Sequence, residues 1–270
     1  MSGNEFDRAA RASRKKQSSN HFISRDWAWE YLRRNGRFVE SWFAAHPKFE
    51  IVGKVDSVTT LRTYASTTEL NPWGVLYTDP PTVAADAAAV IWQPRLCSDV
   101  LWTVTEPYGA RAGVNRFCLR EMNVPSLLLF ASDTLQNLLF LGSGRGVQLV
   151  VHGASLLEPV HMFVDAVPAV KKMHRQFMTL SCFNDLRLRG RVLPSHRQRA
   201  SDSLRLHRAL VALDGCLGGL SNYEIAVSLY GERHVEAGWS DPERYFYDHI
   251  RKLIGRGKTL MNGGYLRFLR

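Results

Sequence analysis

Basic and aromatic side chains are interleaved near the C-terminal end of the chain, in the stretch DPERYFYDHIRKLIGRGK at residues 241–258. Lys and Arg bind phosphate oxygens, and Arg can also hydrogen-bond to the edges of bases. The chemistry that these residues could perform is therefore the binding of a polyanion such as nucleic acid. The candidate base-reading residues are Arg244, Tyr245 and Tyr247, and the candidate phosphate-binding residues are Arg251, Lys252, Arg256 and Lys258.

The net charge of the chain is positive and is concentrated at its two ends. The 270 residues carry 35 Lys and Arg against 25 Asp and Glu, which gives a formal charge of +10. Residues 1–25 contribute +4, residues 171–186 contribute +2 and residues 187–270 contribute +7, whereas residues 26–170 contribute −3. A basic terminal segment is typical of a polyanion binder. A solubilising surface is the alternative explanation of the same charge.

The sequence offers no pattern for metal or enzyme chemistry. Its cysteines are scattered, without a CxxC motif or a Cys/His cluster, which argues against a zinc site and a disulfide framework; they are Cys97, Cys118, Cys182 and Cys216. The GSGRG stretch at residues 142–146 is followed by the strand pattern VQLVV, so it predicts a hairpin turn and not a phosphate loop. We therefore predict no metal, no cofactor and no catalytic residue.

Two helices are expected to position the basic residues. Ser221 and Glu224 form a capping box at the start of a helix over residues 221–231. A second helix over residues 241–255 begins next to Pro242, where a missing N–H group costs nothing. The small side chain of Ala226 would let the two helices cross closely, as in a helix-turn-helix.

The segment between these helices, ERHVEAGWSD, has about ten residues and is expected to be irregular. An ordinary helix-turn-helix has a turn of three or four residues. The pattern therefore predicts either an extended-turn variant of this motif or a helical bundle whose surface is basic.

The N-terminal part of the chain predicts a helical hairpin rich in tryptophan. The stretch RDWAWEYLRRNGRFVESWFAAHP contains two apolar helical patterns separated by Asn35 and Gly36. Its tryptophans either hold the two helices together or mark a docking surface. The candidate docking residues are Trp27, Trp29, Trp42 and, near the C-terminus, Trp239.

The predicted fold class is α+β, with an N-terminal helical hairpin, a small central antiparallel β region and a C-terminal all-α extended-turn helix-turn-helix domain. Short apolar runs separated by Gly, Pro, Asn and Asp indicate the central strands. The expected segments are a flexible basic arm at 1–24, a helical regulatory domain at 25–85, a β-rich region at 86–168, a connecting helix at 169–189, a linker at 190–203 and the DNA-binding domain at 204–270.

We expect a cytoplasmic protein. The sequence contains no run of 18 or more uncharged apolar residues, so no membrane-spanning helix is expected. The polar N-terminus lacks the apolar core of a secretory signal.

Several longer motifs resemble a known family. The sequences AWEYLRRN near the N-terminus, SNYEIAVSLYG at 221–231 and a final GGY are similar to FseA-type transcriptional activators of proteobacterial integrative and conjugative elements. The similarity extends over most of residues 20–270. It implies an extended-turn helix-turn-helix at the C-terminus and an N-terminal helical domain that docks on it.

The resemblance also implies a function and partners. The protein would bind promoter DNA and activate genes for excision or transfer of a mobile element, with an antiactivator protein that binds the N-terminal domain as the implied partner. RNA polymerase is a further candidate partner, which the resemblance itself does not name. We expect no enzymatic activity and no membrane partner.

Three alternatives remain. One is a protein-binding regulator without its own operator. Another is a DNA strand-transfer enzyme that would use His196, Arg199 and either Tyr223 or Tyr230. The last is a sensor whose ligand pocket lies in the central strands.

Overall fold

The computed structural model describes residues 22–45, 49–63, 69–109, 116–142, 146–165, 173–190, 200–239 and 245–270. Their contacts divide the chain into two compact units. We call Met1–Asn35 with Arg197–Phe268 the helical unit, and Gly36–His196 with Leu269–Arg270 the sheet unit. The expected basic arm lies almost wholly outside the described residues, as do residues 191–199 of the expected linker.

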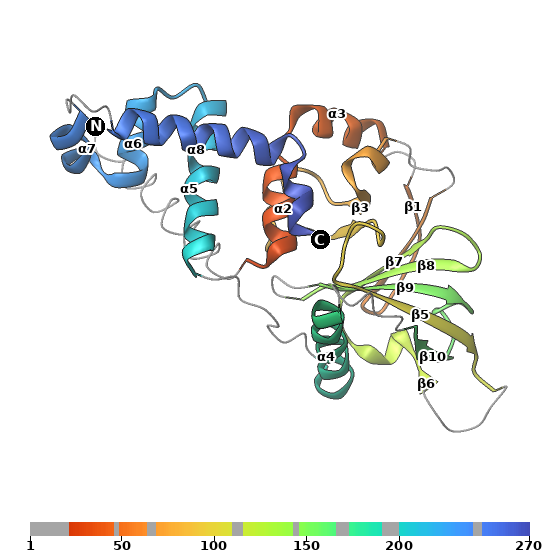
Figure 1. Ribbon diagram of the computed structural model, residues 1–270. Helices are drawn as coiled ribbons and strands as arrows, with labels where there is room; N and C mark the ends of the chain where they lie inside the picture. Colours follow the sequence, from red (N-terminus) through yellow and green to blue (C-terminus); the bar gives the residue numbers. More distant parts are fainter. Residues whose placement is uncertain are drawn as a thin grey trace. The chain divides into compact units, whose positions relative to one another are not determined.

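The helical unit combines one N-terminal helix with the C-terminal helices (Figure 1). Its elements are α2 (Ser24–Leu32), α5 (Ala200–Leu217), α6 (Asn222–Tyr230), α7 (Glu232–Trp239), α8 (Tyr245–Met261) and the 3-10 helix η4 (Gly264–Phe268). Its apolar core joins all of the helices from α5 to α8, through Ala209, Ala212, Ile225, Ala226, Val235, Ile250 and Leu253.

Helix α2 is fastened to the C-terminal helices by polar contacts as well as by packing. The Tyr31 hydroxyl donates to the carbonyl of Leu206 at 2.8 Å. The Arg34 guanidinium forms an ion pair with Asp214 of α5, and its Nη2 donates to that carboxylate at 2.9 Å. The Asn35 amide donates to the carbonyl of Met261 at 3.1 Å. The folded helical unit therefore needs both ends of the chain.

The sheet unit is built on an eight-stranded sheet with the order β1-β2-β7-β8-β9-β5-β10-β6. These strands are β1 (Phe49–Val55), β2 (Val58–Thr63), β5 (Val100–Pro107), β6 (Arg116–Phe117), β7 (Ser126–Phe130), β8 (Leu135–Phe140), β9 (Val147–Gly153) and β10 (Val160–Val164). The pairs β2–β7 and β5–β9 are parallel and the other pairs are antiparallel, so the sheet is mixed.

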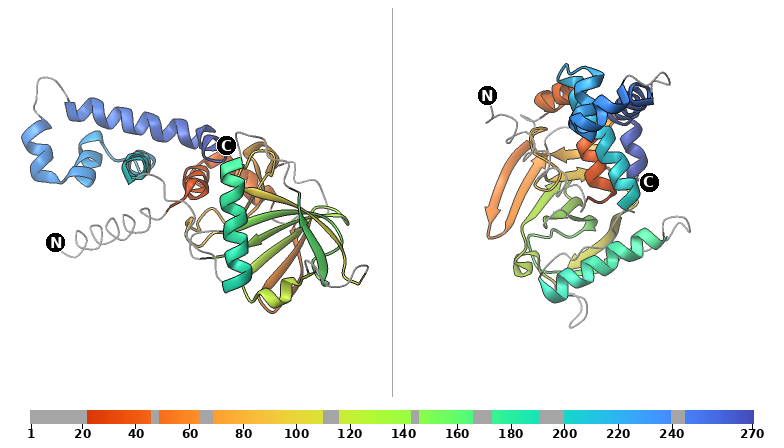
Figure 2. Two further views of the ribbon diagram at one scale, coloured as in Figure 1. Left: turned by 60° about the horizontal axis from the view of Figure 1, so that its bottom comes forward. Right: turned by 90° about the vertical axis from the view of Figure 1, so that its left-hand side faces the viewer.

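The two faces of this sheet are covered by different elements. Helix α4 (Met173–Arg189) lies across one face, as Figure 2 shows, and buries Phe183 and Leu186 in the larger core cluster. On the other face, Ile91 of the hairpin β3 (Val75–Thr78) and β4 (Val90–Trp92) joins Leu61, Leu129 and Leu139 in a second cluster. The remaining elements are α3 (Gly36–Ala45), η2 (Asn71–Trp73) and η3 (Leu119–Met122).

The predicted fold class was wrong in two respects. The central region is a large mixed sheet and not a small antiparallel one, because β2 and β5 each run parallel to a neighbour. The N-terminal region is also not simply a helical hairpin: α2 and α3 belong to different units, and β1 and β2 follow them at 49–63. The β-branched residues of FEIVGKV and VTTLRT favour these two strands.

Two local predictions have definite outcomes. The hairpin expected at GSGRG is confirmed, since β8 and β9 pair antiparallel on either side of it, although residues 143–145 themselves lie outside the described part. The segment ERHVEAGWSD was expected to be irregular, but Glu232–Trp239 forms α7. Its Val235 is fully buried against α6 and α8, and this packing stabilises a helix that the sequence pattern did not reveal.

None of the described helices has the length and apolarity needed to cross a membrane. In the same residues, no three His, Cys, Asp or Glu side chains gather in a group that could hold a metal ion.

Candidate nucleic-acid interface

Helix α8 carries the predicted phosphate-binding residues and is held rigidly by its apolar face. Ile250, Leu253, Gly257 and Leu260 are buried at intervals of three and four residues. At Gly257 the backbone of α8 comes so close to α5 that an added Cβ would lie 2.8 Å from the carbonyl oxygen of Ala209. This close crossing fixes which side of α8 faces outward.

The opposite face of α8 is exposed and basic. Arg251, Lys252, Arg256 and Lys258 are all exposed. Arg251 and Lys258 are seven residues apart and share one stripe of the helix, while Lys252 and Arg256 are four apart and share a neighbouring stripe. Within the described residues, none of these four cations has a carboxylate within 4 Å. Their charges are therefore available to an anionic partner.

A second basic contribution comes from α5 and was not recognised in the sequence. The Arg208 guanidinium lies over the Tyr230 ring, 5.4 Å from its centroid. The Tyr230 hydroxyl lies 2.8 Å from Nε2 of His249 on α8. Burial, and then the charges of Arg208 and Lys252, lower the pKa of His249 below its ordinary value. Arg208 and Lys252 thus act on the same side chain although they are 44 residues apart in the sequence.

Helix α6 is positioned by the predicted capping box, which is confirmed. The Ser221 Oγ accepts from the Glu224 N–H at 3.3 Å, and the Glu224 carboxylate accepts from the Ser221 N–H at 2.8 Å. Ile225 and Ala226 then pack into the core of the helical unit. An added Cβ at Gly215 of α5 would lie 2.7 Å from Ile225, so this glycine, whose role no sequence pattern predicted, permits the α5–α6 packing.

Of the three candidate base-reading residues, the structure describes the side chain of Tyr247 alone. Arg244 lies outside the described residues, and the side chain of Tyr245 is likewise not described. Tyr247 is half-buried on α8 and lies four residues before Arg251, on the same stripe of the helix. The base-reading role of these residues stays a prediction.

The candidate docking tryptophans lie in three different surroundings. Trp27 and Trp29 are buried in α2, which packs against η4, α8 and α5 within the helical unit. Trp42 belongs to the sheet unit, where its Nε1 donates to the carbonyl of Thr78 at 3.1 Å. Trp239 packs edge-on against Tyr223, with the ring centroids 5.0 Å apart. The four side chains therefore do not form one surface.

The comparison with protein families adds a finding about the C-terminal part of the chain. Residues 167–270 match the RovC DNA-binding domain family, which is described as "T6SS, Transcription factor, DNA binding domain". The matched residues include α5 to α8 and thus the whole basic face of α8. This match supports the coarser prediction of a DNA-binding transcriptional regulator. The search of curated proteins found no match.

Proposed function

We propose that the protein is a sequence-specific DNA-binding transcriptional activator that binds double-stranded DNA through the exposed face of α8. The observation that carries this proposal is the group of four exposed cations on a helix within the matched DNA-binding domain. Their two stripes suit the two phosphate-lined edges of a groove, with the first turn of α8 nearest the bases.

The cations of α8 would supply most of the affinity by displacing counterions from DNA. About four phosphate contacts correspond to a slope of about −3.6 in a plot of log affinity against log salt concentration. Arg208 of α5 adds a positive charge that acts on His249, as Lys252 does, without lying on α8 itself.

The direct test is selection of binding sites from the source genome. Purified full-length protein would be mixed with sheared genomic DNA, the retained fragments sequenced, and their affinities measured with random DNA as competitor. The proposal expects a small set of fragments whose binding survives the competitor. Binding that is equal for every fragment would contradict sequence-specific recognition and favour the protein-binding alternative.

The selected fragments would also identify the target genes. The resemblance of the two ends of the chain to activators of mobile elements points to promoters for excision and conjugative transfer. The family description points instead to T6SS genes. If the selected fragments lie upstream of only one of these two gene sets, that set is the target. A reporter gene fused to a selected promoter then tests whether the protein activates transcription.

We further propose that the protein acts in the cytoplasm without enzymatic activity, with an antiactivator and RNA polymerase as its protein partners. The strand-transfer alternative would need a tyrosine nucleophile, and the Tyr230 hydroxyl, 2.8 Å from His249 Nε2, is one of its two candidates. Incubation with supercoiled plasmid should leave its topology unchanged. A relaxed product that disappears in Tyr223→Phe or Tyr230→Phe would establish the strand-transfer enzyme instead.

A further inference from the structure

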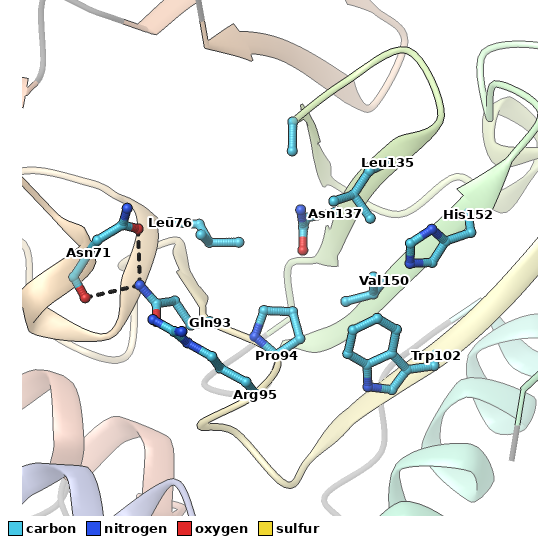
Figure 3. A pocket seen from close by; sticks show the side chains of 11 residues that line it. Asn71, Leu76, Gln93, Pro94, Arg95, Trp102, Leu135, Asn137, Val150 and His152 are labelled. Carbon is cyan, nitrogen blue, oxygen red and sulfur yellow. Dashed lines mark hydrogen bonds between the residues drawn. The ribbon is translucent and has the colours of Figure 1, made fainter. Parts of the chain in front are cut away.

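The sheet unit contains a pocket that the DNA-binding proposal does not use. It has a volume of about 360 Å³ and lies between strands β8, β9 and β5 of the large sheet and the turn after β4 (Figure 3). Its lining combines apolar side chains with a few polar ones, which is typical of a small-molecule site. The lining includes Gln93, Arg95, Trp102, Asn137, Val150 and His152.

The pocket floor is set by the register of three strands. Asn137 of β8 pairs with Val150 of β9, and Val150 pairs with Trp102 of β5. Residues paired in this way lie on the same face of a sheet, so the three side chains form one row. His152 lies two residues after Val150 and thus on the same face.

The opposite wall is held in place by amide hydrogen bonds. The Gln148 side chain, on the pocket face of β9, accepts from the Trp92 N–H at 3.1 Å and donates to the Trp92 carbonyl at 2.7 Å. The Gln93 Nε2 donates to both the carbonyl and the Oδ1 of Asn71 at 3.0 Å. The pocket is therefore formed before any ligand binds.

Asn137 gives the pocket a specific polar requirement. Its side chain is 1 % exposed, and its Oδ1 has no hydrogen-bond partner among the described residues. An unpaired buried acceptor costs about 1–3 kcal/mol. A bound molecule that donates an N–H group to this oxygen would remove that cost.

Two aromatic rings and one arginine of the pocket indicate the shape and the charge of its ligand. The rings of Trp102 and His152 are nearly parallel, with an interplanar angle of 11° and centroids 5.8 Å apart, and Trp102 is 37 % exposed. Arg95 is exposed at the rim, and its Nε donates to Gln93 Oε1 at 3.1 Å. No Asp or Glu is among the described residues that line the pocket, so none of these residues neutralises the guanidinium.

We propose that this pocket binds a small planar nitrogen heteroaromatic anion. The ring packs beside Trp102, a ring or exocyclic N–H donates to Asn137 Oδ1, and a carboxylate or phosphate pairs with Arg95. A base or an indole that carries one anionic group has the size for a pocket of this volume.

The test is binding of two such probes, adenosine 5′-monophosphate and indole-3-carboxylate, to the full-length protein without DNA. Saturation-transfer NMR would compare each anion with its neutral counterpart, adenosine or indole, and with ribose 5-phosphate. We expect at least one aromatic anion to bind about tenfold more tightly than its neutral counterpart and ribose 5-phosphate not to bind. Failure of both anions to bind at millimolar concentrations would overturn the proposal.

Two variants assign the contacts. Arg95→Met should abolish the preference for the anion, while Arg120→Met, which removes an exposed arginine of the same unit outside the pocket, should not change it. Asn137→Leu should weaken binding about tenfold without lowering the unfolding temperature, because it replaces a side chain whose buried Oδ1 has no described hydrogen-bond partner with an apolar one. Unchanged binding in both pocket variants would show that the probes bind elsewhere and would overturn the assignment. DNA binding does not enter this test, so its outcome is independent of the proposed function.

Discussion

Single charged residues of the helical unit differ in their neighbours. On α8 the four exposed cations have no carboxylate within 4 Å in the described part of the chain, so they contribute little to stability and are free for a ligand. In α2, by contrast, the Glu30 carboxylate is buried between Arg33 and Arg34, with Oε2 2.9 Å and 2.5 Å from their nearest nitrogens. Substitutions of the exposed cations on α8 should therefore affect DNA binding, and substitutions of the buried Glu30 and its arginine partners should affect folding.

Removing one phosphate-binding cation should change the salt dependence of DNA binding. For Lys252→Met we expect weaker binding to all sequences alike and a log–log salt slope that is less steep by about 1, because one counterion fewer is released. Titrations at several salt concentrations measure this slope. Lys54→Met in β1 is the control and should keep the slope of the unaltered protein, and an unchanged slope in Lys252→Met would remove this residue from the interface.

Glu30 should make the helical unit sensitive to acid. Burial by itself raises the pKa of Glu30, but the charges of Arg34 and Arg33 outweigh it, so the pKa lies below the ordinary value of 4.5. A lowered pKa contributes stability above the ordinary value, and this contribution is lost as the pH falls through the folded-state pKa.

The free energy of unfolding should therefore fall as the pH is lowered from about 5 to 3, and it should fall less steeply in Glu30→Gln. Denaturant titrations at each pH measure this change. Glu236→Gln, which alters an exposed carboxylate of α7, should behave like the unaltered protein. Parallel pH profiles for Glu30→Gln and the unaltered protein would be inconsistent with the lowered pKa.

At the scale of elements, two glycines of α8 have opposite roles. An added Cβ at Gly257 would meet the Ala209 carbonyl oxygen and Leu213 Cβ at 2.8 Å, whereas no atom of the described residues lies within 4 Å of an added Cβ at Gly255. The two positions are separated by a single residue of one helix, so they share the same intrinsic helix propensity and differ only in packing.

We expect Gly257→Ala to destabilise the helical unit by about 1–3 kcal/mol through overpacking. Gly255→Ala should stabilise it by about 0.5–1 kcal/mol, because alanine is the better helix former. Thermal unfolding measures both variants, and the unfolding temperature should fall in Gly257→Ala and rise in Gly255→Ala. If both changes stabilise the protein, α5 and α8 do not cross at Gly257.

These elements also show how far the sequence can be interpreted. The capping box of Ser221 and Glu224 and the buried stripe through Ile250 and Leu253 were predictable, because both signals are contained within a few consecutive residues. The strands at 49–63 were missed because the apolar residues of FEIVGKV do not alternate with polar ones, although their β-branched types favour a strand. Gly257 could not be assigned, since its role depends on Ala209, which lies 48 residues away in the sequence.

At the scale of the whole molecule, the chain leaves the helical unit after Asn35 and returns to it at Arg197. No short-range pattern predicts such an arrangement, because it depends on contacts such as that of Arg34 with Asp214, 180 residues apart. The same separation explains why a pocket in the central strands could be named only as an alternative, without its lining residues: these come from 71 to 152 and meet only when the sheet has formed.

Breaking the contact between the two ends should destabilise the helical unit alone. Arg34→Met leaves the buried Glu30 and the partly buried Asp214 without this partner, and we expect a loss of about 3–5 kcal/mol. Hydrogen exchange should speed up in α5 and α8 but not in β7, β8 and β9. Arg205→Met, which removes an exposed arginine of α5, should leave all of these rates unchanged. Equal acceleration in both units would show that they unfold together.

The DNA-binding role of α8 is tested by the affinity of a charge-reversed α8 for a fragment selected from genomic DNA. Arg251→Glu with Lys252→Glu should reduce specific binding at least about a hundredfold while the circular dichroism spectrum and the unfolding temperature stay the same. Lys54→Glu with Arg120→Glu changes the net charge equally at two exposed positions of the sheet unit and should bind as the unaltered protein does. If the folded α8 variant binds the fragment normally, or if both double variants lose affinity equally, α8 is not the DNA-binding face.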